Sequence, residues 1–163
     1  MTSRLLLSPI TEGNLSDLFG LYSERAVAEF VGGERLTAPA IAQQTEDFAA
    51  EWGHRGYGRS AVYRRDTGDF IGWIGLHYMP HWDDIELGYV LNAAAQGVGF
   101  AREGCLAWLD WAKESSRIES VIASIHPDNA SSIRLAMKLG FDLERRDCTP
   151  SGRPTLVYRR SWS

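Results

Sequence analysis

Residues 96–101 (Gln-Gly-Val-Gly-Phe-Ala) carry two glycines separated by one residue, between a predicted strand and a predicted helix. Glycine adopts positive φ at little cost and lets the backbone approach a ligand closely. A helix that begins after such a turn points unpaired N–H groups and the positive end of its dipole outward, which suits a phosphate group. The segment has neither the Gly-Lys-Ser/Thr of a Walker A loop nor the Gly-x-Gly-x-x-Gly dinucleotide fingerprint. The pattern alone is compatible with an anion site and equally with a tight helix start.

Residues 128–141 form a second informative segment, straight after a short predicted strand. Asn129 is suited to cap a helix at its N-terminus, and Gly140 is suited to the left-handed position that ends one. Within this helix Ser132 precedes Ala136 by four residues, which places both on one face. The Ser132 hydroxyl can bond the backbone of its own helix or face a bound ligand, and the sequence leaves both alternatives open.

Together, these two segments resemble the GNAT superfamily of acetyl-CoA-dependent N-acetyltransferases. Residues 96–101 look like its Gln/Arg-x-x-Gly-x-Gly/Ala pyrophosphate loop, and residues 129–141 look like its Asn-x-x-Ser/Ala…Lys-Leu-Gly-Phe helix. Residues 86–89 (Glu-Leu-Gly-Tyr), Ser132 and the hairpin at 59–76 are similar to the RimJ/RimL branch, which includes protein N-terminal acetyltransferases acting on ribosomal proteins. The resemblance covers nearly the whole chain. Its motif order is specific for the superfamily and not for the acceptor.

The resemblance implies acetyl-CoA as the co-substrate and no metal. The loop amides of Val98, Gly99 and Ala101 would bind its pyrophosphate. Gln96 opens the motif. Arg102, in the first helical turn, either adds positive charge to this site or is a solvated surface residue.

In the family, the strand before this loop splays from the next strand, and the pantetheine arm of acetyl-CoA lies in the gap. Here the two strands are expected at 85–91 and 120–125. A backbone N–H near Tyr89, Val90 or Leu91 would then hold the thioester oxygen, as an oxyanion hole does.

Glu86 is the candidate general base, acting directly or through a water. The attacking amine must be neutral: an α-amine with a pKa near 7.7–8.0 is roughly one-tenth neutral at pH 7, whereas a lysine near 10.4 is neutral about once in 2,500. The base has less work with an α-amine, so we expect a protein N-terminus as acceptor, with a small-molecule amine as the alternative. The competing interpretation of Glu86 is a solvent-facing strand residue, opposite the face of Ile85 and Leu87.

The chain departs from the wider family at the acid that protonates the leaving thiolate. Many members carry a tyrosine where this chain has Ala136. In the RimJ/RimL branch a serine at the position of Ser132 is proposed to take that role. Since a serine hydroxyl is a weak acid, it would hydrogen-bond the sulfur or relay a proton. Asn129 would cap its helix and also bond the pantetheine or a nearby water. The missing tyrosine leaves a non-catalytic acyl-CoA-binding sensor as a second alternative.

The elements that must position these residues alternate along the chain. Helices are expected at 14–30, from Thr37 onward, at 98–115 and at 129–139, and strands at 4–10, 59–65, 70–78, 85–91, 120–125, 141–148 and 156–162. Three consecutive strands favour antiparallel pairing, and a strand-helix-strand unit favours one parallel pair. With the resemblance, this order predicts a three-layer α/β/α GNAT-like fold. Its sheet is mixed and mostly antiparallel, with about seven strands and a splayed central parallel pair.

The composition is typical of an ordinary globular protein. The 163 residues are 44% hydrophobic and 23% charged, which fits a single acetyltransferase domain over 1–163. The formal net charge of −4 gives no global basic excess for nucleic acid or an anionic membrane. No apolar run is long enough to span a bilayer. A homodimer fits the family, although no residue here indicates one.

The cysteines and histidines indicate neither a disulfide framework nor a metal site. Cys105 and Cys148 lack CxxC spacing, so we expect reduced thiols. Since the N-terminus also lacks a signal-peptide core, this predicts a cytoplasmic protein. His77 and His81, with Asp83 and Asp84 nearby, match no metal template and predict a polar turn.

Overall fold

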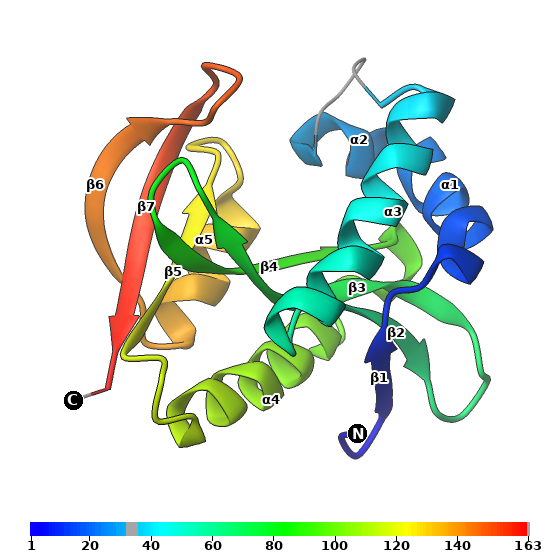
Figure 1. Ribbon diagram of the computed structural model, residues 1–163, viewed down its shortest axis with the longest axis horizontal. Coiled ribbons are helices and arrows are strands. Elements are labelled where there is room, and N and C mark those ends of the chain that lie inside the picture. Colours follow the sequence, from blue (N-terminus) through cyan, green and yellow to red (C-terminus); the bar gives the residue numbers. More distant parts are fainter. Residues whose placement is uncertain (32–35, 163) are drawn as a thin grey trace. The chain divides into compact units, whose positions relative to one another are not determined.

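The computed structural model describes residues 1–31 and 36–162 (Figure 1). Its strands are β1 (Leu5–Pro9), β2 (Arg59–Arg64), β3 (Phe70–Met79), β4 (Asp84–Leu91), β5 (Ser120–Ile125), β6 (Asp142–Cys148) and β7 (Pro154–Ser161). Its helices are α1 (Leu15–Ser23), α2 (Arg25–Val31), α3 (Ala38–Arg55), α4 (Phe100–Glu114) and α5 (Ala130–Lys138), with short 3-10 turns η1 (Glu12–Asn14) and η3 (Ala93–Ala95).

The seven strands are hydrogen-bonded in the order β1-β2-β3-β4-β5-β7-β6. β4 and β5 run parallel, with Glu86 opposite Ile122, and α4 is the crossover between them. The pairs β1–β2, β2–β3, β5–β7 and β6–β7 are antiparallel. The predicted mixed sheet with one parallel pair is therefore confirmed.

The chain divides into two compact units. The first comprises Met1–Gly75 with Tyr89–Cys105, and the second comprises Leu76–Gly88 with Leu106–Ser163. Among the residues that the structure describes, no helix is long and apolar enough to cross a bilayer.

In the first unit, helices cover both faces of the paired strands β2 and β3. Trp73 and Ile74 follow each other on β3 and therefore point to opposite faces. Trp73 packs in a core with Tyr22 of α1 and Phe48 of α3, whose ring centroid lies 5.8 Å from that of Trp73. On the other face, Gly104 of α4 packs so closely that a Cβ there would lie 2.3 Å from Ile74 Cδ1. The predicted α/β/α layering is present in this unit.

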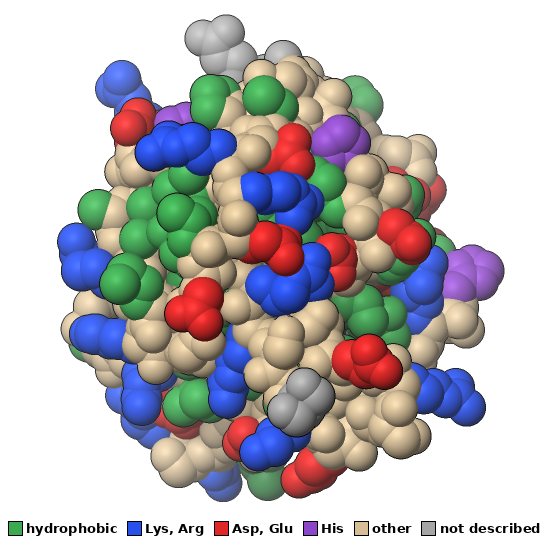
Figure 2. All heavy atoms as spheres, turned by 90° about the vertical axis from the view of Figure 1, so that its left-hand side faces the viewer, with side chains coloured by type: hydrophobic (Ala, Val, Ile, Leu, Met, Phe, Trp, Pro, Cys, Tyr) green, Lys and Arg blue, Asp and Glu red, His purple; other side chains and the backbone are tan. Residues whose placement is uncertain are grey.

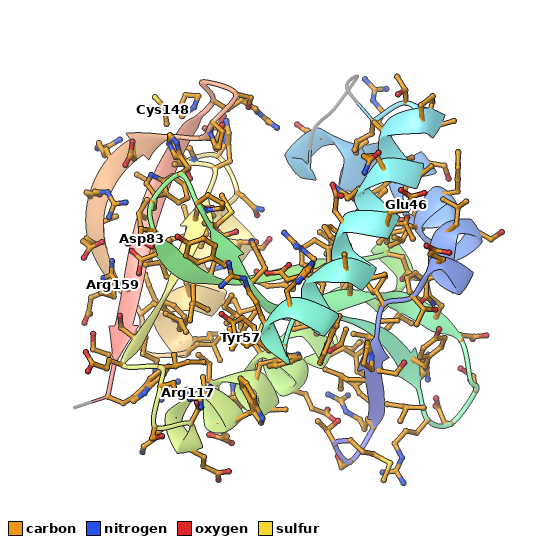
Figure 3. The ribbon with its side chains drawn as sticks, in the orientation of Figure 1. Glu46, Tyr57, Asp83, Arg117, Cys148 and Arg159 are labelled. Atoms are coloured by element: carbon orange, nitrogen blue, oxygen red, sulfur yellow. The ribbon has the colours of Figure 1, made fainter. Side chains whose placement is uncertain are left out.

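In the second unit, Arg159 of β7, labelled in Figure 3, joins side chains of β4, β5 and β6. Its guanidinium donates to both carboxylate oxygens of Asp84, at 2.9 and 2.7 Å, to Glu144 at 2.7 Å and to Ser120 at 2.9 Å. Arg159 is thus a structural crosslink. On the face that carries β6 and β7, basic and acidic side chains are interspersed (Figure 2).

One predicted element differs from the structure. The single helix expected at 14–30 is two helices, because Glu24 has an extended backbone with φ −72° and ψ 122°. The Glu24 carboxylate accepts a hydrogen bond from the Ala93 N–H at 2.8 Å. This contact joins segments far apart in sequence, so apolar spacing along the helix could not indicate the break. The predicted cap at Thr37 is confirmed, as its side chain accepts from the Ala40 N–H at 3.3 Å.

Candidate active site

The loop before α4 has the backbone that its glycines predict. Gly97 and Gly99 have φ values of 79° and 87°, in the left-handed region that favours glycine. Helix α4 begins at Phe100, and the first N–H groups of a helix have no partner within it. The Val98 side chain is 52% exposed. The segment is thus a turn with two left-handed glycines that leads into a helix N-terminus, as an anion site requires.

Three side chains hydrogen-bond to the backbone of residues 91–95, the turn that precedes this loop. Gln96 Nε2 donates to the Leu91 carbonyl at 3.1 Å, and Asn92 Oδ1 accepts from the Ala95 N–H at 3.0 Å. Glu24 holds the Ala93 N–H, as described above. The structure therefore places the Gln96 side chain against the turn that precedes the loop. Arg102, in the first turn of α4, is exposed.

The end of β4 directs one backbone amide away from β3. The Val90 carbonyl lies against Gly72 of β3, where a Cβ would be 2.0 Å from the Val90 oxygen. The next amide that turns toward β3 is that of Asn92, which donates to the Ile71 carbonyl at 2.9 Å. Carbonyl and N–H of one trans peptide point in opposite directions, so the Leu91 N–H points away from β3. The side chains of Val90 and Leu91 are buried in the core.

Glu86 is buried between two polar side chains. It is 9% exposed, so the solvent-facing interpretation is wrong. His77 Nε2 of β3 lies 2.9 Å from Glu86 Oε1, and Ser124 Oγ of β5 donates to Glu86 Oε2. A carboxylate is tolerated in the interior when such groups satisfy its oxygens. His77 therefore lies beside Glu86, within the strand predicted at 70–78 and not in the turn that follows it.

Sequence reasoning missed His77 and Ser124 as partners of Glu86. The signal that could have found them is the strand order, because β3, β4 and β5 are neighbours in the sheet. Ser124 lies two residues beyond Ile122, the residue opposite Glu86, and residues two apart on a strand point to the same face. Closeness in sequence instead groups His77 with His81. In the structure His81 Nε2 lies 3.0 Å from the Cys148 carbonyl oxygen. Across residues 1–31 and 36–162, the structure shows no group of three His, Cys, Asp or Glu side chains suited to hold a metal.

Helix α5 carries the other two predicted site residues. Asn129 Oδ1 accepts from the Ser132 N–H at 3.3 Å and from Ser131 Oγ at 3.2 Å, so Asn129 caps the helix as predicted. Ser132 is half-buried, and Ala136 is 5% exposed one turn further on. Gly140 has φ 83° and ends the helix in the left-handed conformation that the sequence predicted.

The thiol of Cys105 is not available for acyl transfer. Cys105 lies fully buried in α4, and this burial raises the pKa of its thiol. A thiolate is the nucleophilic form of cysteine, so a buried, protonated thiol does not attack a thioester. Cys105 and Cys148 are both free.

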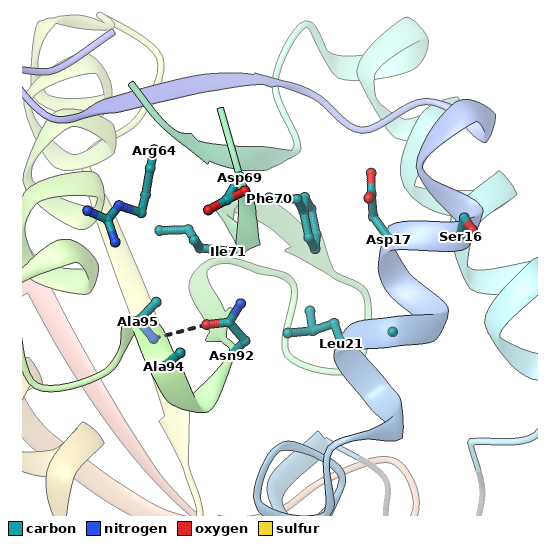
Figure 4. A pocket seen from close by; sticks show the side chains of 11 residues that line it. Ser16, Asp17, Leu21, Arg64, Asp69, Phe70, Ile71, Asn92, Ala94 and Ala95 are labelled. Atoms are coloured by element: carbon teal, nitrogen blue, oxygen red, sulfur yellow. Dashed lines mark hydrogen bonds between the residues drawn. The ribbon is translucent and has the colours of Figure 1, made fainter. Parts of the chain in front are cut away.

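A separate hollow of about 490 Å³ lies in the first unit, beside η3 (Figure 4). Its wall is formed by α1, the β2–β3 turn and η3, and its lining residues are Ser16, Asp17, Gly20, Leu21, Arg64, Asp69, Phe70, Ile71, Asn92, Ala94 and Ala95. None of the predicted site residues lines it. The hollow contacts the turn that precedes the glycine loop and is distinct from the predicted site.

Residues 4–142 match the family model described as an acetyltransferase (GNAT) domain. The uncharacterized N-acetyltransferase YoaA of Bacillus subtilis is 29% identical over 145 residues, which cover 88% of this chain and 82% of YoaA. The solved structure of an acetyltransferase from Agrobacterium tumefaciens is 26% identical, with a TM-score of 0.87 over 99% of this chain and 93% of that one.

Two further solved structures share the fold and contain ligands. RimL, a ribosomal L7/L12 α-N-protein acetyltransferase in complex with coenzyme A, has a TM-score of 0.81 at 17% identity, over 98% of this chain and 95% of RimL. AAC(6′)-Ib in complex with paromomycin and acetyl-CoA has a TM-score of 0.80 at 19% identity, over 98% of this chain and 94% of that one. The family match covers most of the chain and includes both the glycine loop and Glu86.

Proposed function

Because the chain belongs to the GNAT family of acetyltransferases, we propose that it transfers the acetyl group of acetyl-CoA to a primary amine by direct attack in a ternary complex. The favoured acceptor is the α-amine of a protein N-terminus. The observation that carries the proposal is the buried Glu86 carboxylate, held by His77 and Ser124 in a protein of this family.

Acetyl-CoA binds at the glycine loop in this proposal. The N–H groups of Val98, Gly99 and Ala101 face the pyrophosphate, helped by the positive end of the α4 dipole. Arg102 directly follows Ala101 in the first turn of α4, and its exposed guanidinium adds positive charge there. Asn129 caps α5 and contacts the pantetheine arm, which lies between β4 and β5.

Glu86 is the base that deprotonates the acceptor. The amine nitrogen attacks the thioester carbon, a C–N bond forms, and the proton of the ammonium passes to Glu86 directly or through a water. Negative charge develops on the thioester oxygen, and the Leu91 N–H is the donor aimed at it. Collapse of this intermediate breaks the C–S bond and releases the CoA thiolate.

Ser132 supports the leaving group. Ala136 occupies the position where many family members carry an acidic tyrosine hydroxyl, and the Ser132 hydroxyl lies one turn before it on α5. A serine hydroxyl hydrogen-bonds the departing sulfur or relays a proton to it. Direct attack agrees with the burial of Cys105, which removes that thiol as a carrier of the acetyl group.

An α-amine is favoured because it needs the least help from the base. An α-amine is roughly one-tenth neutral at pH 7, and a lysine side chain is neutral about once in 2,500. The likeness to RimL, an α-N-protein acetyltransferase, supports a place in the RimJ/RimL branch and an action on protein N-termini. The likeness to AAC(6′)-Ib supports a small-molecule amine as the second candidate acceptor.

The acceptor is tested by release of CoA thiol from acetyl-CoA across a matched panel. Each peptide is supplied with a free N-terminus and with an acetyl-blocked one, beside small amines and an aminoglycoside. Turnover with free N-termini that is lost on blocking supports the proposal. Turnover with small amines alone moves the assignment to the second candidate. Tight acetyl-CoA binding without any turnover would indicate a sensor.

A further inference from the structure

Arg4, just before β1, contacts the glycine loop and the start of α4 at three points. Its Nη1 donates to the Val98 carbonyl at 2.9 Å, and its Nε donates to Glu103 Oε2 at 2.7 Å. Its guanidinium carbon lies 4.5 Å from the centroid of the Phe100 ring. The Arg4 N–H also donates to Glu103 Oε1, at 2.8 Å. One arginine from the chain's first residues therefore holds the loop, the first helical residue and the first turn of α4.

The contact with the Val98 carbonyl sets the direction of the next amide. In a trans peptide the carbonyl and the following N–H point in opposite directions. Because Arg4 holds the Val98 oxygen, the Gly99 N–H points to the side of the loop away from Arg4. Gly99 has φ 87°, and glycine itself restrains this backbone little. The restraint comes from Arg4, through its hydrogen bond to the Val98 carbonyl.

The ion pair between Arg4 and Glu103 compensates a negative charge close to the glycine loop. Burial acts to raise the pKa of Glu103, but hydrogen bonds from Thr2 and Arg4 outweigh it and hold the pKa below its usual value. Glu103 is therefore ionised at neutral pH, in the first turn of α4. An unpaired carboxylate there would repel a phosphate, and the Arg4 guanidinium compensates it at 2.7 Å.

We propose that Arg4 is a positioning residue for acetyl-CoA binding: it fixes the Gly99 N–H toward the pyrophosphate and neutralises Glu103. This inference rests on the proposed function, in which residues 96–101 bind that pyrophosphate. It assigns to the first residues of the chain a role in cofactor affinity. The role depends on the fork geometry of the guanidinium, because Nε and Nη1 reach Glu103 and Val98 at the same time.

The experiment compares Arg4→Met, Arg4→Lys and the charge-matched control Arg117→Met, whose arginine is exposed in the second unit. Calorimetry measures the dissociation constant of acetyl-CoA for each full-length protein. Hydrogen–deuterium exchange without ligand measures the amides of residues 97–102, with β5 as the internal reference. The exchange readout reports the loop's backbone directly, and an unchanged β5 shows that the variants are folded.

Loss of the charge-assisted bonds is expected to weaken acetyl-CoA binding by about tenfold to a hundredfold in both Arg4 variants, with Arg117→Met within about twofold of wild type. Exchange at 97–102 is expected to quicken in both Arg4 variants. Wild-type binding in Arg4→Lys with loss in Arg4→Met would mean that charge alone matters and would overturn the positioning role. Unchanged binding in both would overturn the whole inference. If the wild type itself fails to bind acetyl-CoA, the proposed function is wrong. In that case the exchange data still test Arg4 by themselves: unchanged exchange at 97–102 in Arg4→Met would show that Arg4 does not restrain the loop.

Discussion

His77 Nε2 lies 2.9 Å from Glu86 Oε1, and the two side chains are only 4% and 12% exposed. Ser124 binds the second carboxylate oxygen. With both oxygens held, the carboxylate has one orientation. In its proposed role as base, a carboxylate fixed in this way would need no reorganisation when the amine arrives, which is the advantage of a preorganised site.

Removing His77 should lower kcat, because the Glu86 carboxylate would lose one of the two groups that hold it in place. His77→Ala is expected to reduce kcat by about tenfold, since a positioned proton acceptor contributes a hundredfold or more and remains present but loosely held. The KM for acetyl-CoA should stay the same, and His77→Gln, which keeps an N–H donor, should recover part of the rate. Steady-state kinetics with the best acceptor checks this. The control is His54→Ala, which removes an exposed histidine. An equal loss of kcat in this control would show that the effect is not specific to the contact between His77 and Glu86.

Gly72 should tolerate no side chain. It has φ 144°, and a Cβ would lie 2.0 Å from the Val90 carbonyl oxygen, so β3 and β4 would have to separate. Gly72→Ala is expected to cost about 2 kcal/mol or more of unfolding free energy. At Gly53, in α3, a Cβ would have open space around it, with no neighbouring atom within 4 Å. Gly53→Ala should instead be neutral or stabilise by about 0.5–1 kcal/mol. Urea unfolding of both variants checks the pair, and equal midpoints would be inconsistent with the packing described.

Arg159→Met should destabilise the second unit in a pH-dependent way. The variant leaves Asp84 and Glu144 without their shared partner, at a cost of about 1–3 kcal/mol at pH 7. The hydrogen bond from Arg159 holds the pKa of Glu144 below its usual value. A carboxylate with a lowered folded pKa contributes stability above its unfolded pKa and loses it as pH falls through the folded one.

The difference between wild type and Arg159→Met should therefore be full at pH 7 and shrink below about pH 4, where an unfolded glutamate is protonated. Chemical unfolding at several pH values measures it. A difference that stays constant down to pH 2 would show that the lost packing of the arginine, and not its ion pairs, is responsible.

The two thiols should differ in reactivity. Cys148 is exposed, whereas Cys105 is buried and its pKa is raised by that burial. Iodoacetamide should label Cys148 in the native protein and Cys105 only after unfolding, as read by mass spectrometry. Cys105→Ala should keep acetyl transfer, because direct attack uses no enzyme thiol. A stable acetyl group on Cys105 after incubation with acetyl-CoA would argue for a different mechanism.

Local backbone requirements were the best-predicted features. Gly97, Gly99 and Gly140 take the positive φ that their places in the sequence indicate, and Asn129 and Thr37 cap their helices. These features depend on a few consecutive residues, so one sequence contains the information. The mixed sheet was also predictable, since the element order together with the family motifs leaves few topologies.

Contacts between distant segments could not be predicted. The Glu24 carboxylate, at the break between α1 and α2, accepts from the distant Ala93 N–H, and the burial of Glu86 depends on strands that bring His77 and Ser124 to it. Alternation along β4 even favoured an exposed Glu86, because a strand buried on both faces shows no simple alternation. The grip of Arg4 on the glycine loop likewise joins residues 94 apart in sequence.

The role of Glu86 as base is tested most directly by CoA-thiol release from acetyl-CoA. Wild type, Glu86→Gln and the control Glu119→Gln, whose glutamate is exposed, are compared with the best acceptor at saturation. Turnover is expected from wild type and Glu119→Gln, with a loss of about a hundredfold or more in Glu86→Gln and unchanged acetyl-CoA affinity. Wild-type rates in Glu86→Gln would contradict the role of Glu86 as base. Tight acetyl-CoA binding by the wild type with no thiol release above background, for any amine, would contradict the proposed catalysis itself.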